Sequence, residues 1–67
     1  MSLKRYANRL TKIREAMEAE LESVITKIDA AQERNAKQSV IDKLEEEMSS
    51  LEDAISTLEN LEMEWEA

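Results

Sequence analysis

The sequence predicts an all-α protein folded as an antiparallel helical hairpin of two long helices. The 67 residues include no Gly, Pro, His or Cys, so the usual turn residues are missing and strong helix formers dominate. Apolar residues recur every three or four positions over most of the chain, which is the spacing of amphipathic helices. A polar stretch at residues 32–39 interrupts this pattern near the middle, with Ala36 as its only apolar residue.

The first helix is expected over about residues 3–34. Ser2 is a suitable N-cap, because its hydroxyl can accept a hydrogen bond from an unpaired backbone N–H. The apolar stripe has two successive spacings of four around Met17, and this interruption of the heptad favours straight bundle packing over a long regular supercoil. The stripe consists of Leu3, Tyr6, Leu10, Ile13, Met17, Leu21, Val24, Ile28 and Ala31.

The turn between the helices is expected at about residues 35–39. Asn35 is the best available residue for a left-handed position after a helix, since the chain has no Gly. Ser39 followed by Asp42 resembles a capping box, with Asp in the place of the usual Glu. A helix stop and a helix start therefore lie close together.

The second helix is expected over about residues 40–66, which completes a single domain of residues 1–67. Its stripe is regular as far as Leu58 and then drifts, because Glu62 occupies the next heptad position. The stripe consists of Ile41, Leu44, Met48, Leu51, Ile55, Leu58, Leu61 and Trp65.

A continuous helix is the alternative to the hairpin. The interval from Ala31 to Ile41 divides into steps of three, four and three, so a straight helix would carry its seam through Arg34 and Gln38. Two such helices would form an antiparallel coiled coil, in which polar seam residues are tolerated. The capping signals favour the hairpin.

The apolar stripe is too wide for two helices alone, since pairs such as Val24-Ile25 and Val40-Ile41 put apolar groups on adjacent positions. We therefore expect the hairpin to form a homodimer, in which two copies of the chain pack as a four-helix bundle. The expected oligomer interface comprises Leu10, Ile13, Met17, Leu21, Val24, Ile25, Ile28, Ile41, Leu44, Met48, Leu51, Ile55, Leu58 and Leu61.

Charge is unevenly distributed along the chain. Residues 1–14 carry five of the nine basic groups and no acid, whereas the net charge of the whole chain is −7. Two further hypotheses follow: an acidic antagonist of a basic, nucleic-acid-binding protein, and a weak nucleic-acid binder that uses the basic N-terminal strip. The negative net charge opposes the second. Tyr6, Arg9 and Trp65 are candidate contacts for an unknown protein partner.

Catalysis is not expected, because the chain has neither His nor Cys to act as general base, thiol nucleophile or zinc ligand. No cofactor or metal is expected, since a di-iron bundle site requires His beside its carboxylates. No membrane span or signal segment is recognisable, so a soluble cytoplasmic protein is expected. The sequence thus predicts a non-enzymatic, self-associating protein-interaction module, of a size that fits accessory or regulatory proteins of phages and mobile elements.

Overall fold

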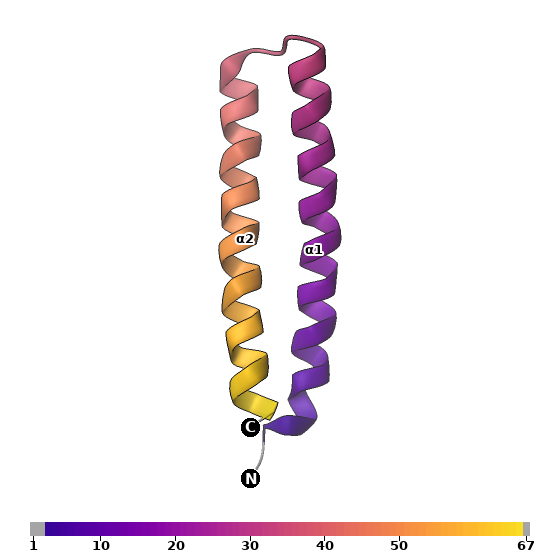
Figure 1. The fold of residues 1–67 in the computed structure, drawn as a ribbon, viewed down its shortest axis with the longest axis vertical. Helices are drawn as coiled ribbons and strands as arrows, with labels where there is room; N and C mark the ends of the chain where they lie inside the picture. Colours follow the sequence, from indigo (N-terminus) through magenta and orange to yellow (C-terminus); the bar gives the residue numbers. More distant parts are fainter. Residues whose placement is uncertain (1–2, 67) are drawn as a thin grey trace.

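The computed structural model describes residues 3–66, which form two antiparallel α-helices (Figure 1). Helix α1 spans Lys4–Glu33 and helix α2 spans Gln38–Glu66. The Cα trace measures 53 × 14 × 10 Å, with the turn at one end and the start of α1 beside the finish of α2 at the other, here called the open end. The predicted hairpin is confirmed, and the continuous helix is wrong.

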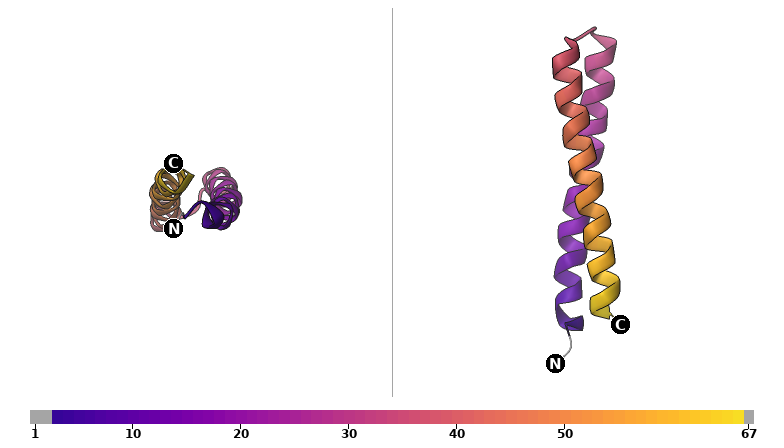
Figure 2. Two further views of the ribbon diagram at one scale, coloured as in Figure 1. Left: turned by 90° about the horizontal axis from the view of Figure 1, so that it is seen from below. Right: turned by 90° about the vertical axis from the view of Figure 1, so that its left-hand side faces the viewer.

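The two helices form a single layer and cross each other along their length (Figure 2). The backbone at Leu3 precedes α1 without a side-chain cap, and its carbonyl oxygen accepts a hydrogen bond from the N–H of Tyr6 at 2.9 Å. Ser2, predicted as the N-cap, lies outside the described residues. Among the described residues, the start of α1 is therefore stabilised by this backbone hydrogen bond and not by a side-chain cap.

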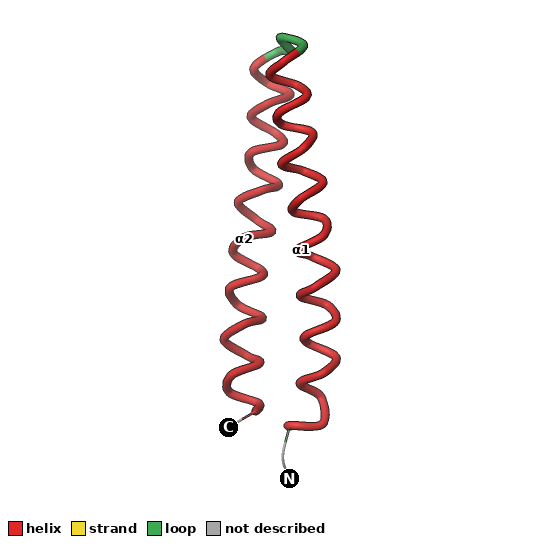
Figure 3. Tube along the Cα trace, turned by 45° about the vertical axis from the view of Figure 1, so that its right-hand side comes forward, coloured by secondary structure: helices red, strands yellow, loops and turns green. Residues whose placement is uncertain are grey.

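The turn between the helices is short (Figure 3), and α1 finishes in a Schellman motif. The N–H of Ala36 donates to the carbonyl of Ala31 at 2.9 Å, and the N–H of Asn35 donates to the carbonyl of Gln32 at 3.2 Å. Asn35 has φ = 54°, the left-handed region, so its predicted place after the helix is confirmed. Two of the unpaired carbonyls at the helix end thereby gain donors.

Helix α2 starts earlier than the predicted capping box requires. It begins at Gln38, and the carbonyl of Lys37 accepts from the backbone N–H groups three and four residues later, at 3.0 and 3.3 Å. Ser39 is consequently inside the first turn and not before it. Asp42 accepts a hydrogen bond from the Gln38 side chain at 2.8 Å. The predicted capping box is wrong, because the compact Schellman turn leads straight into the helix.

The helices meet along a seam with regular heptad spacing, in which positions a and d face the other helix. Every seam residue is buried or half-buried. The a positions are Ala7, Arg14, Leu21 and Ile28 in α1, and Ile41, Met48, Ile55 and Glu62 in α2. The d positions are Leu10, Met17, Val24 and Ala31 in α1, and Leu44, Leu51, Leu58 and Trp65 in α2.

This seam corrects the predicted stripe. Arg14 is half-buried, whereas the predicted Ile13 is 50% exposed. Glu62 is only 8% exposed and takes the seam place that was predicted for Leu61. Ala7 likewise replaces Tyr6 as the buried residue near the start of α1. The predicted interruption around Met17 is therefore absent, since the seam passes through charged residues and not around them.

Candidate protein-interaction surface

The hairpin has two different long edges. On a helix, heptad position e adjoins a, and g adjoins d, at about 100° per residue. In an antiparallel pair, the g positions of both helices lie on one edge and the e positions on the other. The structure agrees, because Glu20 of α1 and Glu47 of α2, both at g, line one groove together with Val24 and Leu51, both at d.

The edge formed by d and g positions is apolar toward the open end, and we call this half the apolar edge. Ile13 is its most exposed member, and the others are half-buried. It is formed from both helices, so it spans the full width of the hairpin. Its residues are Tyr6, Leu10, Ile13 and Met17 from α1, and Ala54, Leu58, Leu61 and Trp65 from α2.

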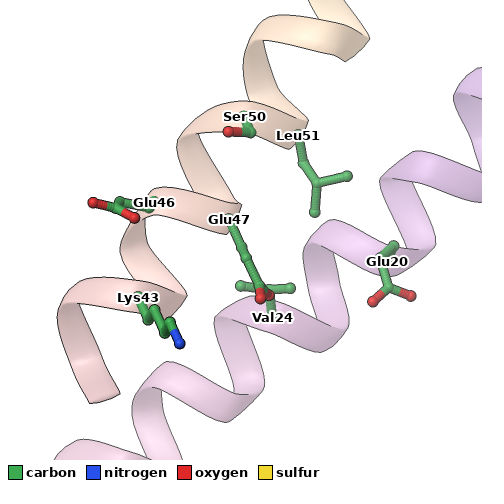
Figure 4. Close-up of a pocket in the computed structure, with 7 residues that line it drawn as sticks. All are labelled: Glu20, Val24, Lys43, Glu46, Glu47, Ser50 and Leu51. Atoms are coloured by element: carbon green, nitrogen blue, oxygen red, sulfur yellow. The ribbon is translucent and has the colours of Figure 1, made fainter. Parts of the chain in front are cut away.

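The same edge becomes acidic toward the turn, where the helices border a shallow groove of about 640 Å³ (Figure 4). Val24 and Leu51 form its apolar floor, with Leu51 pointing from α2 toward α1. Charged and polar side chains form its rim. We call this feature the acidic groove, and its rim is made of Glu20, Lys43, Glu46, Glu47 and Ser50.

The opposite edge, formed by a and e positions, is closed by polar groups. Nε of Arg14 donates to Oε2 of Glu62 at 2.9 Å, and Nη1 of Arg14 donates to Oε1 of Glu18 at 2.9 Å. The side chains of Arg14 and Glu62 are 23% and 11% exposed. All four e positions of α2, residues 45, 52, 59 and 66, are Glu. This polar edge is therefore unlike the apolar edge across the hairpin.

The Glu62 carboxyl has a lowered pKa. The Thr11 hydroxyl lowers it most, burial raises it, and the hydrogen bond and charge of Arg14 lower it further. The single hydroxyl proton of Thr11 is donated to the Ala7 carbonyl at 3.1 Å, and Oε1 of Glu62 is left without a hydrogen-bond partner. Rotation of that hydroxyl toward Glu62 would supply the missing donor. In return, the hydrogen bond to Glu62 raises the pKa of Arg14.

The predicted partner contacts gather at the open end. The guanidinium carbons of Arg5 and Arg9 lie 4.9 and 5.4 Å from the centre of the Tyr6 ring, within the range of cation–π contacts. Arg5 also donates to the Tyr6 hydroxyl at 2.9 Å. Trp65 is half-buried in the last turn of α2. The structure thus brings Tyr6 and Arg9 together in a cationic aromatic cluster, and their role in binding stays a prediction.

The sequence analysis missed the seam pair Arg14 and Glu62. A signal was present, since Glu62 was seen to occupy the heptad position after Leu58. Stepping by the same heptad from Ala31 back toward the start of the chain reaches Arg14 and Ala7. The predicted stripe took the larger apolar neighbours Ile13 and Tyr6 in place of Arg14 and Ala7, and so it missed this register.

Over residues 3–66, no three Asp, Glu, His or Cys side chains gather in a way that could hold a metal ion. Neither described helix contains an apolar stretch long enough to cross a membrane. Comparisons with protein-family models, with curated proteins and with solved structures found no match. The case for function therefore depends on the surfaces of this chain.

Proposed function

We propose that this chain is a non-enzymatic protein-interaction module that associates with a second copy of itself through the apolar edge, forming a four-helix bundle. The observation that supports this most is the incomplete burial of its leucines. All seven are in the described part of the chain and none is buried, although five occupy seam positions. Apolar surface left in water contributes nothing to stability, whereas covering it contributes about 25 cal/mol per Å².

The small size of the chain also supports self-association. The buried apolar core of the single hairpin consists of six residues among those described, and two of them are alanines. Domains of this length commonly need oligomerisation, disulfides or a metal to become stable. A second hairpin laid on the apolar edge would bury residues of both helices at once. In a two-fold dimer the same surface patch of each copy packs against its counterpart, so the apolar edge is sufficient to form the interface on both copies.

The proposed interface is narrower than the one predicted from the sequence. Ile13 lies on the apolar edge, whereas Ile25 occupies an e position on the polar edge. Both are isoleucines of α1 with similar exposed fractions, 50% for Ile13 and 42% for Ile25. They consequently form a matched pair for testing which edge associates.

The test is the mass in solution of the intact chain and of two variants. Sedimentation equilibrium at micromolar concentration should give about twice the chain mass of 7.7 kDa for the wild type. Ile13→Glu should shift the protein to monomer, because it places a charge in the interface, and Ile25→Glu should remain dimeric. Circular dichroism at the same concentration monitors helix content. A fully helical wild-type monomer, or dissociation by Ile25→Glu with Ile13→Glu still dimeric, would contradict the proposal.

The nucleic-acid hypothesis has less support. Arg14 forms ion pairs with Glu18 and Glu62, and the guanidinium of Arg9 lies over Tyr6. These contacts reduce the number of cations of the N-terminal strip that are available for phosphate. The negative net charge adds long-range repulsion.

A further inference from the structure

We propose that the two hairpins pair with their turns at opposite ends and overlap from their open ends as far as the near end of the acidic groove, where Tyr6 and Arg9 of each copy meet Glu20 of the other. This arrangement rests on the self-association proposed above and specifies its geometry. The occupant of the acidic groove is thus a second copy of the chain, and each copy contributes both a cluster and a groove.

The first support is where the apolar g positions stop. Toward the open end these positions hold Tyr6, Ile13, Ala54 and Leu61. Toward the turn they are mostly charged, being Glu20, Lys27 and Glu47, with Val40 as the exception. An overlap along the whole hairpin would press these charged groups against apolar side chains. Overlap that extends only from the open end to Glu20 buries apolar surface against apolar surface, and the one charged g position of α1 that it covers is the Glu20 that meets Tyr6 and Arg9 of the other copy.

The second support is spacing along α1. Tyr6 precedes Ile13 by seven residues and Glu20 follows Ile13 by seven, which is about 10 Å in each direction at 1.5 Å per residue. Suppose that the two-fold axis passes near Ile13, the most exposed residue of the apolar edge. Tyr6 of one copy then lies level with Glu20 of the other, beside the apolar floor of the acidic groove.

The third support is charge. The rim of the acidic groove has three Glu and one Lys. The guanidinium groups of Arg5 and Arg9 lie over the aromatic ring of Tyr6. With the turns at opposite ends, Arg9 approaches the rim of the other copy, where opposite charges meet. With both turns at the same end, Glu20 and Glu47 of the two copies would lie level with each other. Like charges in close contact oppose that alternative.

One spin label distinguishes the two arrangements. The chain has no cysteine, so Lys37→Cys places a single label in the turn, at an exposed position. Because Lys37 is 24 residues from Ile13, labels at opposite ends should be separated by roughly 70 Å, measured by pulsed electron paramagnetic resonance. Turns at the same end would give a distance on the order of 10–25 Å, given interaxial distances of 8–10 Å. A short distance overturns the arrangement and leaves dimerisation intact, whereas a monomer overturns both.

Charge reversal tests the contact itself. Arg9→Glu and Glu20→Arg should each weaken dimerisation on the order of tenfold, and the double variant should recover most of the loss, because each dimer contains the contact twice. Lys12→Glu makes the same change of charge as Arg9→Glu on an exposed face of α1 away from the apolar edge, and should leave the dissociation constant unchanged. Equal losses for Arg9→Glu and Lys12→Glu, or no recovery in the double variant, would overturn the proposed contact.

Discussion

Arg14 and Glu62, 48 positions apart in the chain, form an ion pair inside the helix seam, with Nε of Arg14 donating to Oε2 of Glu62 at 2.9 Å. Both residues occupy a positions, where the other members are apolar. A polar layer of this kind is satisfied in one alignment of the two helices, since sliding either helix by a turn would separate the charges. The pair therefore favours the observed register over shifted alternatives.

Removing one partner of this pair should be worse than removing both. Arg14→Leu leaves the Glu62 carboxylate mostly buried without its cation, so the thermal midpoint should fall clearly below that of the wild type. The double variant Arg14→Leu/Glu62→Leu replaces the pair with apolar groups and should be at least as stable as the wild type. Circular dichroism melts at pH 7 and one protein concentration measure this. A double variant less stable than Arg14→Leu alone would contradict the expectation.

Stability should depend on pH through Glu62. Its folded-state pKa is below the usual value of 4.5, so ionisation favours the folded state. That contribution is present above pH 4.5 and is lost as the pH falls below 4.5 through the folded-state pKa. Glu62→Gln lacks it, so the gap in thermal midpoint between wild type and variant should be constant from pH 7 to about pH 5.

The gap should then shrink below pH 4.5. The other groups near this carboxyl, namely Arg14, Thr11, Glu18 and Glu59, are the same in both proteins, so the comparison isolates the ionisation of Glu62. A gap that widens on acidification would show that Glu62 is stabilised in its protonated form.

The turn should tolerate glycine better than alanine at position 35. Asn35 has φ = 54°, which an alanine side chain disfavours, so Asn35→Ala should lower the free energy of unfolding by about 1 kcal/mol. Asn35→Gly should remain within about 0.5 kcal/mol of the wild type, because glycine adopts this backbone freely. Urea unfolding at a fixed protein concentration compares them. Equal stability of the two variants would argue against a left-handed residue here.

Local properties of the chain were sufficient to predict the two helices and the place of the turn. Absence of Gly and Pro, apolar spacings of three and four, and one asparagine beside a polar stretch each act over a few residues. The helix boundaries were accordingly close, α1 being expected over about 3–34 and observed at Lys4–Glu33. The capping box failed because a serine near a helix start caps only if the backbone places it before the first turn.

The heptad register of the seam shows why one continuous helix would not bury both apolar stripes. Extending the α1 heptad from Ala7 through the turn would put Asp42 and Glu45 on the seam. The observed α2 seam begins one residue earlier, with Ile41 and Leu44. A difference of one residue is about 100° around the helix, so a straight rod could not keep both apolar stripes on one face.

The sequence by itself determined that the chain is helical and amphipathic on both sides of a polar stretch, and it favoured a reversal near Asn35 over a continuous helix, because propensity, periodicity and turn chemistry are local. The tertiary structure alone decided between Ile13 and Arg14, and between Leu61 and Glu62, as residues of the seam. Either neighbour fits an amphipathic helix, and the choice depends on what the facing helix presents. Arg14 can enter the seam because Glu62 is opposite it, and the displaced isoleucine at position 13 then forms part of the exposed apolar edge.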